Sequence, residues 1–158
     1  MTLHIRWMIR RDLDEVLAIE RDSFSNPWDE EIFIHVLRER NNIGMVVDYQ
    51  DKVIAFMVYA LSKARLEVVD FAVHPDYRRQ GVGRAMARKL ISKLEHPGAK
   101  RRRIDLFIAD FNLDGQLFWQ AMGFRALRIA PDWFECGTDA YFFSYRLPKQ
   151  SDRAASVS

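Results

Sequence analysis

The residues most able to do chemistry lie in one segment, VHPDYRRQGVGR, which runs from Val73 to Arg84 between a predicted strand and a predicted helix. A helix N-terminus exposes unpaired N–H groups and the positive end of the helix dipole. Glycine lets a diphosphate approach such a backbone because it has no Cβ. The two glycines therefore predict a phosphate-binding loop, with charge added by Arg78, Arg79 and Arg84. The alternative is a tight strand-to-helix turn with solvated arginines.

Two other phosphate motifs are excluded by the residues after the glycines. The Walker A loop needs Lys and then Ser or Thr after its second glycine, whereas Gly83 is followed by Arg84 and Ala85. The dinucleotide fingerprint GxGxxG needs a small residue in place of Met86. That fingerprint also belongs to a βαβ unit, and the strands before this loop are predicted to follow one another as an antiparallel meander.

Hydrophobic periodicity places the loop in a mixed chain of strands and helices. Strands are predicted over 3–10, 43–48, 53–61, 66–73, 104–109, 124–130 and 139–147. Helices are predicted from Asp12, from Asn26-Pro27, over 84–95 and over 113–122. Asp12 with Glu15 resembles a capping box, and Pro27 suits a first helical position. The resulting order, β α α β β β α β α β β, predicts an α/β (α+β) fold with a mostly antiparallel sheet.

Composition predicts one globular domain over 3–148 and a disordered polar tail over 149–158, since 49% of the 158 residues are hydrophobic. The net charge of +2 is too small to indicate direct binding of nucleic acid. The single cysteine, Cys136, cannot form an internal disulfide. The chain begins without the apolar region of a signal peptide and holds no membrane-spanning run, so we expect a cytoplasmic protein that does not bind membranes.

Residues 78–83, RRQGVG, resemble the acetyl-coenzyme A signature R/QxxGxG/A of the GNAT acetyltransferases. The preceding AVHPDYR, the following amphipathic helix and the element order are similar to that superfamily over 3–147. The chain looks most like the ribosomal-protein alanine acetyltransferase branch, because it has Pro27-Trp28 and the run TDAYFF near its end. The resemblance implies a GNAT fold with about seven strands and four helices, and an N-acetyltransferase that uses acetyl-CoA as co-substrate.

The same resemblance implies which residues bind acetyl-CoA. Backbone groups of the strand before the loop would hold the pantetheine arm, and amides of residues 79–84 would hold the pyrophosphate. Asn112, Trp119 and Gly123-Phe124 match the spacing of the family's second cofactor motif, although Asn112 also suits a helix N-cap. The implied cofactor-binding residues are Phe71, Ala72, Val73, Arg78, Arg79, Gln80, Gly81, Val82, Gly83, Arg84, Asn112 and Trp119.

The chain departs from this branch at the two positions that move protons. Phe107 stands where the branch has a glutamate base, and Trp119 stands where it has a tyrosine acid. Neither side chain can exchange a proton at neutral pH. At pH 7 about one-seventh of α-amines but only about one in 2,500 lysine amines are neutral, so an N-terminal acceptor needs a weaker base. The departure therefore favours an α-amine acceptor or a loss of catalysis.

Other groups are candidates for the proton steps. Glu67 resembles the general base of the histone acetyltransferase branch in position, and Asp70 is expected nearer the thioester. Either carboxylate could instead be an exposed strand charge or a partner of Arg65. Tyr141 or Tyr145 could protonate the leaving thiolate, but an aromatic residue in a strand also serves packing.

The acceptor is predicted to be a protein or peptide N-terminus. Asp132, Trp133 and Phe134 stand where the branch has the Asn-Tyr-Tyr that touches the peptide. This aromatic loop could hold a cationic amine against its rings, or it could be a hydrophobic plug. Acetylation of a small amine or a lysine, and a non-catalytic coenzyme A binding or sensing module, remain alternative functions.

Two further clusters carry weaker interpretations. The basic run Lys100–Arg103 is interpreted as a solvated loop, with the 3′-phosphate of coenzyme A or a ribosomal surface as alternative partners. The four histidines have no ligand spacing with one another or with Cys136, so no metal site is predicted.

Overall fold

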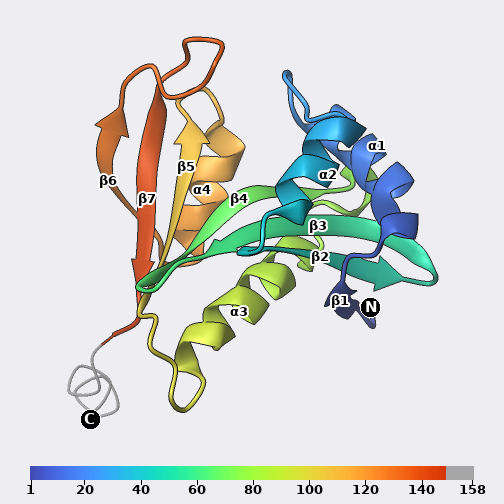
Figure 1. Ribbon diagram of the computed structural model, residues 1–158, viewed down its shortest axis with the longest axis horizontal. Helices are drawn as coiled ribbons and strands as arrows, with labels where there is room; N and C mark the ends of the chain where they lie inside the picture. Colours follow the sequence, from blue (N-terminus) through green and yellow to red (C-terminus); the bar gives the residue numbers. More distant parts are fainter. Residues whose placement is uncertain (149–158) are drawn as a thin grey trace. The chain divides into compact units, whose positions relative to one another are not determined.

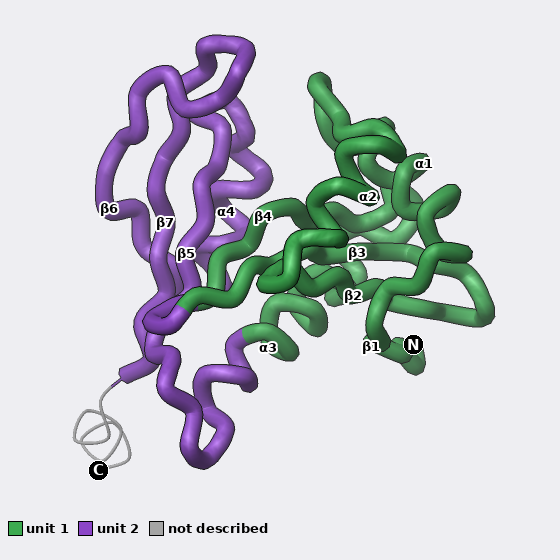
Figure 2. The backbone as a smooth tube through the Cα atoms, in the orientation of Figure 1, with its two compact units in different colours: residues 1–62, 66–90 green, residues 63–65, 91–158 purple. Residues whose placement is uncertain are grey.

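The computed structural model describes residues 1–148, which form two compact units (Figure 2). The first unit contains residues 1–62 and 66–90, and the second contains 63–65 and the described residues from 91 onward. The predicted tail, 149–158, lies outside the described residues.

The helices and strands follow the predicted order, with two short 3-10 helices added. The predicted fold class, a mixed α/β chain of seven strands and four α-helices with mostly antiparallel strand pairing, is confirmed (Figure 1). In chain order the elements are β1 His4–Trp7, η1 Arg10–Asp12, α1 Leu13–Ser23, α2 Glu30–Arg38, β2 Asn42–Tyr49, β3 Lys52–Leu61, β4 Arg65–Val73, η2 Pro75–Tyr77, α3 Val82–Glu95, β5 Arg103–Ala109, α4 Leu113–Ala121, β6 Arg125–Ala130 and β7 Ala140–Arg146.

In the first unit, β1 to β4 pair antiparallel in chain order. Helices α1 and α2 lie on one face of these strands, and the first part of α3 lies on the other (Figure 1). Residues 53–59 of β3 are therefore all buried, which explains why this strand is an unbroken apolar run. The core under α1 and α2 contains Val16, Ile19, Phe33, Phe56 and Val58.

In the second unit, β7 lies between β5 and β6 and pairs antiparallel with both. Helix α4 packs on one face of these strands (Figure 1). The ring of Trp119 lies 4.8 Å from that of Phe124, and the Phe124 ring lies 5.5 Å from that of Tyr145. Aromatic side chains from α4, the turn after it and β7 thus form the core of this face.

The predicted start of the second helix was wrong. Helix α2 begins at Glu30, and the carboxylate of Asp29 accepts a hydrogen bond of 2.9 Å from the N–H of Ile32. Asn26 lies in the connection before the helix. An Asp at the N-cap outweighs the preference of Pro27 for a first helical position, because the carboxylate satisfies an N–H that would otherwise have no partner.

The predicted capping box at the start of α1 was also wrong. Asp12 makes no side-chain cap bond to α1, and its carboxylate instead accepts the N–H of Ile9 at 2.8 Å and the guanidinium of Arg6. The Glu15 carboxylate accepts the N–H of Val53 at 3.0 Å. Both acids therefore join α1 to other segments of the first unit rather than to its own first turn.

Candidate functional site

Strand β4 and the glycine loop that follows it carry most of the predicted site residues, and they lie in the first unit. β4 pairs with β3 through Asp70 opposite Val58 and Glu67 opposite Ala60. The register shifts between these pairs, so Val69 is an extra residue in β4, which is a β-bulge.

The bulge decides which face Glu67 and Asp70 share. Side chains alternate along a regular strand, so residues three apart would lie on opposite faces. Val58 and Ala60 are two apart in β3 and share a face, and directly opposed residues also share a face. Glu67 and Asp70 therefore both lie on the face that α1 covers, with Ala72, which belongs to the core under that helix.

The loop after β4 is held by its own polar side chains. Arg78 donates from Nε to the carbonyl of Val73 at 2.9 Å and from Nη2 to Ser23 Oγ at 3.0 Å. Gln80 Nε2 donates to the carbonyl of Asp76 at 2.9 Å. Arg79 and Gly81 both have positive φ angles, +60° and +85°, which turn the chain into α3.

The start of α3 leaves room for a ligand above its backbone. A Cβ on Gly81 would meet no heavy atom within 4 Å. Arg79, Gln80 and Arg84 are exposed, whereas Val82 is buried. These features fit a pyrophosphate held by backbone N–H groups and arginines.

Asn112 and Trp119 lie in the second unit. Asn112 stands at the start of α4, and Trp119 lies within the helix. Asn112 is the N-cap of α4, and its carbonyl oxygen accepts the N–H of Gly115 at 2.9 Å. Trp119 is buried and packs its ring against Phe118 and Phe124. The N-cap interpretation of Asn112 is confirmed, and the role of either residue toward acetyl-CoA stays a prediction.

An aromatic stack surrounds the position where the branch has its glutamate. The rings of Phe107 and Trp133 are stacked 3.8 Å apart at an interplanar angle of 12°. The guanidinium carbon of Arg128 lies 4.8 Å from the ring centroid of Phe142 and 5.9 Å from that of Phe107. Trp133 thus fixes the β6–β7 connection against β5, an interaction that the aromatic composition of the loop alone did not predict.

Tyr141 lies on the face of the second unit opposite to this stack. It is paired with Ile108 of β5 and Ile129 of β6 and is half-buried. Phe142 follows it directly and points to the other face. The structure therefore separates Tyr141 from Phe107, and the role of Tyr141 as a proton donor stays a prediction.

The structure adds one acid that the sequence did not single out. Glu20 of α1 is buried, and its carboxyl group lies beside that of Asp70. Burial raises the pKa of Asp70 well above its ordinary value, and the adjacent Glu20 raises it further. Burial also raises the pKa of Glu20. No sequence signal links these residues, because α1 and β4 are 50 positions apart and only the fold brings them together.

Comparison with known proteins decides the family. The acetyltransferase (GNAT) family model matches residues 13–124. The chain belongs to the GNAT acetyltransferase family. It is 27% identical over 123 residues to the ribosomal protein bS18-alanine N-acetyltransferase of Escherichia coli, a match that covers 78% of this chain and 81% of the relative. The predicted resemblance to this branch is confirmed, and the GNAT protein is an N-acetyltransferase.

Solved GNAT structures share the fold. Ard1 from Thermoplasma volcanium matches with a TM-score of 0.84 at 21% identity, covering 94% of this chain and 100% of that one. Arabidopsis thaliana NAA60 in complex with acetyl-CoA matches with a TM-score of 0.78 at 17% identity, covering 92% of this chain and 100% of that one.

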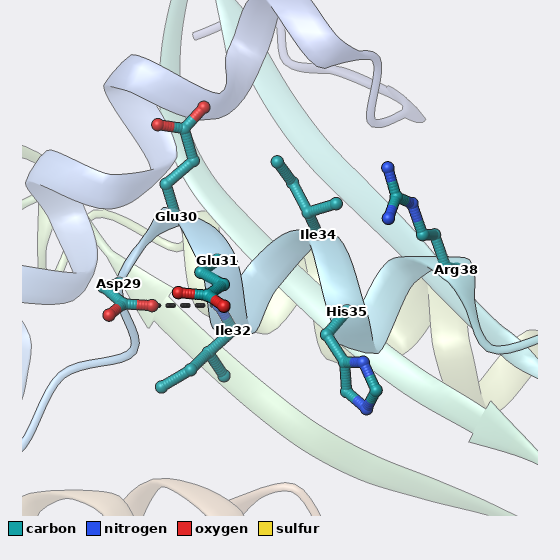
Figure 3. A pocket seen from close by; sticks show the side chains of 7 residues that line it. All are labelled: Asp29, Glu30, Glu31, Ile32, Ile34, His35 and Arg38. Carbon is teal, nitrogen blue, oxygen red and sulfur yellow. Dashed lines mark hydrogen bonds between the residues drawn. The ribbon is translucent and has the colours of Figure 1, made fainter.

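Two grooves of the GNAT chain's first unit lie away from the glycine loop. One, of 810 Å³, follows the outer side of α2 and is lined by Asp29, Ile34, His35 and Arg38 among others (Figure 3). Ile34 and His35 point to opposite sides of the helix there. The other, of 510 Å³, is lined by residues of β1, α1, α2 and β2. Neither contains a predicted site residue.

Two structural properties of the GNAT chain bear on its partners. Within residues 1–148, no three His, Cys, Asp or Glu side chains gather closely enough to hold a metal ion. Over the same range, none of the helices combines the length and apolar content that a membrane crossing needs.

Proposed function

We propose that the protein transfers acetyl from acetyl-CoA to the α-amine of a protein or peptide N-terminus, by direct attack in a ternary complex. The observation that carries the acetyl-CoA assignment is the loop between β4 and α3. It combines exposed arginines, a glycine with a φ of +85° and open space where a Cβ would stand. A diphosphate needs this combination of charge and unobstructed backbone.

The remaining contacts follow the resemblance to the family. The backbone of Phe71, Ala72 and Val73 would bind the pantetheine arm as an added strand does, through main-chain hydrogen bonds. Amides of residues 79–84 would bind the pyrophosphate. The resemblance also assigns Asn112 and Trp119, which belong to the second unit, to the binding of acetyl-CoA.

The acceptor assignment rests on chemistry and on the named relative. The Escherichia coli relative is named for acetylation of an alanine of a ribosomal protein. The chain lacks the glutamate and tyrosine of that branch at Phe107 and Trp119, and an α-amine makes the smallest demand on a base. Glu67 and Asp70 are the proposed proton acceptors, and Tyr141 is the proposed donor to the thiolate. We also propose that the enzyme is cytoplasmic.

The experiment is release of free coenzyme A from acetyl-CoA in the presence of N-terminal peptides, lysine peptides and polyamines, compared with a control without acceptor. Turnover on N-terminal peptides alone supports the proposal. Turnover only on lysines or small amines would replace it with the acetylation of those groups. Acetyl-CoA binding without turnover on any acceptor would instead support a coenzyme A sensing module.

A further inference from the structure

Two carboxyl groups, Glu20 of α1 and Asp70 of β4, lie beside each other, and each has one covered oxygen. The Glu20 residue is 2% exposed, and its Oε1 accepts the N–H of Trp28 at 3.1 Å. Asp70 is half-buried, and its Oδ1 accepts the N–H of Phe71 at 2.9 Å. The second oxygens, Glu20 Oε2 and Asp70 Oδ2, are covered and have no ordinary hydrogen-bond donor in the described part of the chain. Each of these oxygens is therefore left with the other carboxyl group as its partner.

Two ionised carboxylates in this position would repel each other without water to screen them. One proton between them removes a negative charge and turns one carboxyl into a donor. A single O–H···O bond then satisfies both Glu20 Oε2 and Asp70 Oδ2, which otherwise have no hydrogen-bond partner. Two acids that share one proton in this way titrate as a pair.

Several charged groups on the neighbouring segments have other partners. Arg78 donates to Ser23 and to the carbonyl of Val73. Nδ1 of His74 lies 4.0 Å from the carboxylate of Asp76, which is exposed. On α1 itself, Glu15 accepts the N–H of Val53. The residues of β3 under this face, Phe56 and Val58, are apolar.

We propose that Glu20 and Asp70 hold one proton between Oε2 and Oδ2, and that Asp70 is the group that takes the proton of the acceptor amine. The inference rests on the proposed function. Asp70 Oδ2 is covered, but the Asp70 residue as a whole is partly exposed and Glu20 is not, so a proton from the acceptor amine would enter the pair on the Asp70 side. Glu20 acts through Asp70 and is a positioning residue. A carboxylate whose pKa is raised toward neutrality is a stronger base than an ordinary one.

Every proton of the α-ammonium group that is lost in one turnover has a named acceptor. The step starts from the molecules whose pair has lost its shared proton to solvent, a form that grows as pH rises. This doubly ionised pair takes one proton from the α-ammonium group and becomes singly protonated again. The neutral amine then attacks the thioester carbon, so that a C–N bond forms and the C–S bond breaks. The second amine proton balances the coenzyme A thiolate, giving the thiol and the amide. The pair finally releases its proton to solvent.

The first experiment needs no activity. The folded pair keeps a proton at pH values where the unfolded carboxyls, with a pKa of about 4, have lost theirs. The wild-type free energy of unfolding should therefore fall relative to that of Asp70→Asn and Glu20→Gln as pH rises above 5. Asp22→Asn, which changes an exposed acid of the same helix as Glu20, should run parallel to wild type. Parallel curves for wild type, Asp70→Asn and Glu20→Gln in urea titrations would overturn the shared proton.

The second experiment is the pH profile of kcat/KM with an N-terminal peptide. Glu20→Gln removes the neighbouring negative charge, so the rising limb should move to lower pH by at least about one unit. Asp70→Asn should lower kcat/KM by at least about 100-fold. Asp22→Asn, a change at an exposed acid of the same helix as Glu20, should leave the limb in place. The titration of the peptide amine is common to all four proteins. Coincident limbs for wild type and Glu20→Gln would overturn the role of the pair in proton transfer.

The two experiments separate the inference from the function on which it rests. If wild type turns over no acceptor, the proposed function and the proton-transfer role both fail. The unfolding curves still decide whether the pair holds a proton.

Discussion

At the scale of single residues, Asp105 is a fully buried carboxylate that orders one face of the second unit. Its Oδ2 accepts from Arg65 Nη1 at 2.8 Å and lies 3.3 Å from Arg103 Nε, and its Oδ1 accepts from Ser144 Oγ at 2.6 Å. Asp105→Asn should lower the free energy of unfolding by about 2 kcal/mol. The loss is no larger because both arginines are about one-third exposed, so water partly screens their attraction to the carboxylate. Ser144→Ala, which removes one contact, should cost about 1 kcal/mol in the same urea titration. Equal losses would contradict this ranking.

The glycine loop supplies a second prediction at the residue scale. Gly81 and Gly98 have nearly equal φ angles, +85° and +83°, and neither has an atom within 4 Å of an added Cβ. Alanine at either position should therefore cost about the same stability, about 1 kcal/mol. Only Gly81→Ala places a methyl group in the proposed phosphate site, and its acetyl-CoA dissociation constant should rise by about tenfold, or about 1.4 kcal/mol. Calorimetric titration of both variants checks this, and an equal change in both would remove Gly81 from the site.

At the scale of elements, the cap of α2 tests where that helix begins. Asp29→Ala removes the acceptor of the Ile32 N–H and should lower the free energy of unfolding by about 1 kcal/mol. Asp29→Ser, which keeps a capping oxygen, should recover most of the loss. Asn26→Ala is the matched control, because Asn26 is exposed and outside the helix, and it should change stability by less than about 0.5 kcal/mol. A larger effect at Asn26 than at Asp29 would favour the earlier start that the Asn-Pro pair predicted.

At the scale of the whole molecule, the stability of the chain depends on pH through two carboxyl groups whose pKa values are shifted in opposite directions. The hydrogen bonds from Arg6 hold the pKa of Asp12 below its ordinary value, whereas burial raises that of Asp70. The Asp12 contribution is present above the unfolded pKa of about 3.9 and is lost as pH falls through the folded value. The Asp70 contribution has the opposite sign.

Asp12→Asn isolates the acid limb of this dependence. It should cost about 2 kcal/mol at pH 7. The loss should shrink at pH 3, because the Asp12 carboxyl of the unfolded chain, with a pKa of about 3.9, is mostly protonated there. Asp48→Asn is the control and should cost less at pH 7. Arg6 lies 3.4 Å from the Asp48 carboxylate but 2.8 Å from that of Asp12, so the contact with Asp48 is the weaker one. Chemical unfolding at both pH values measures the difference. A loss for Asp12→Asn that stays constant from pH 7 to 3 would show that the ion pair does not set the acid limb.

The sequence by itself determined the element order, the glycine loop and the family, because hydrophobic periodicity and a six-residue motif are local properties of the chain. It also identified Glu67 and Asp70 as acids of β4. Only the tertiary structure placed them on one face, since the extra residue Val69 in the pairing with β3 cannot be read from β4 alone. The partner of Asp70 was likewise decided in three dimensions. Glu20 approaches it because α1 packs on the strands, and it is burial there that makes a shared proton favourable.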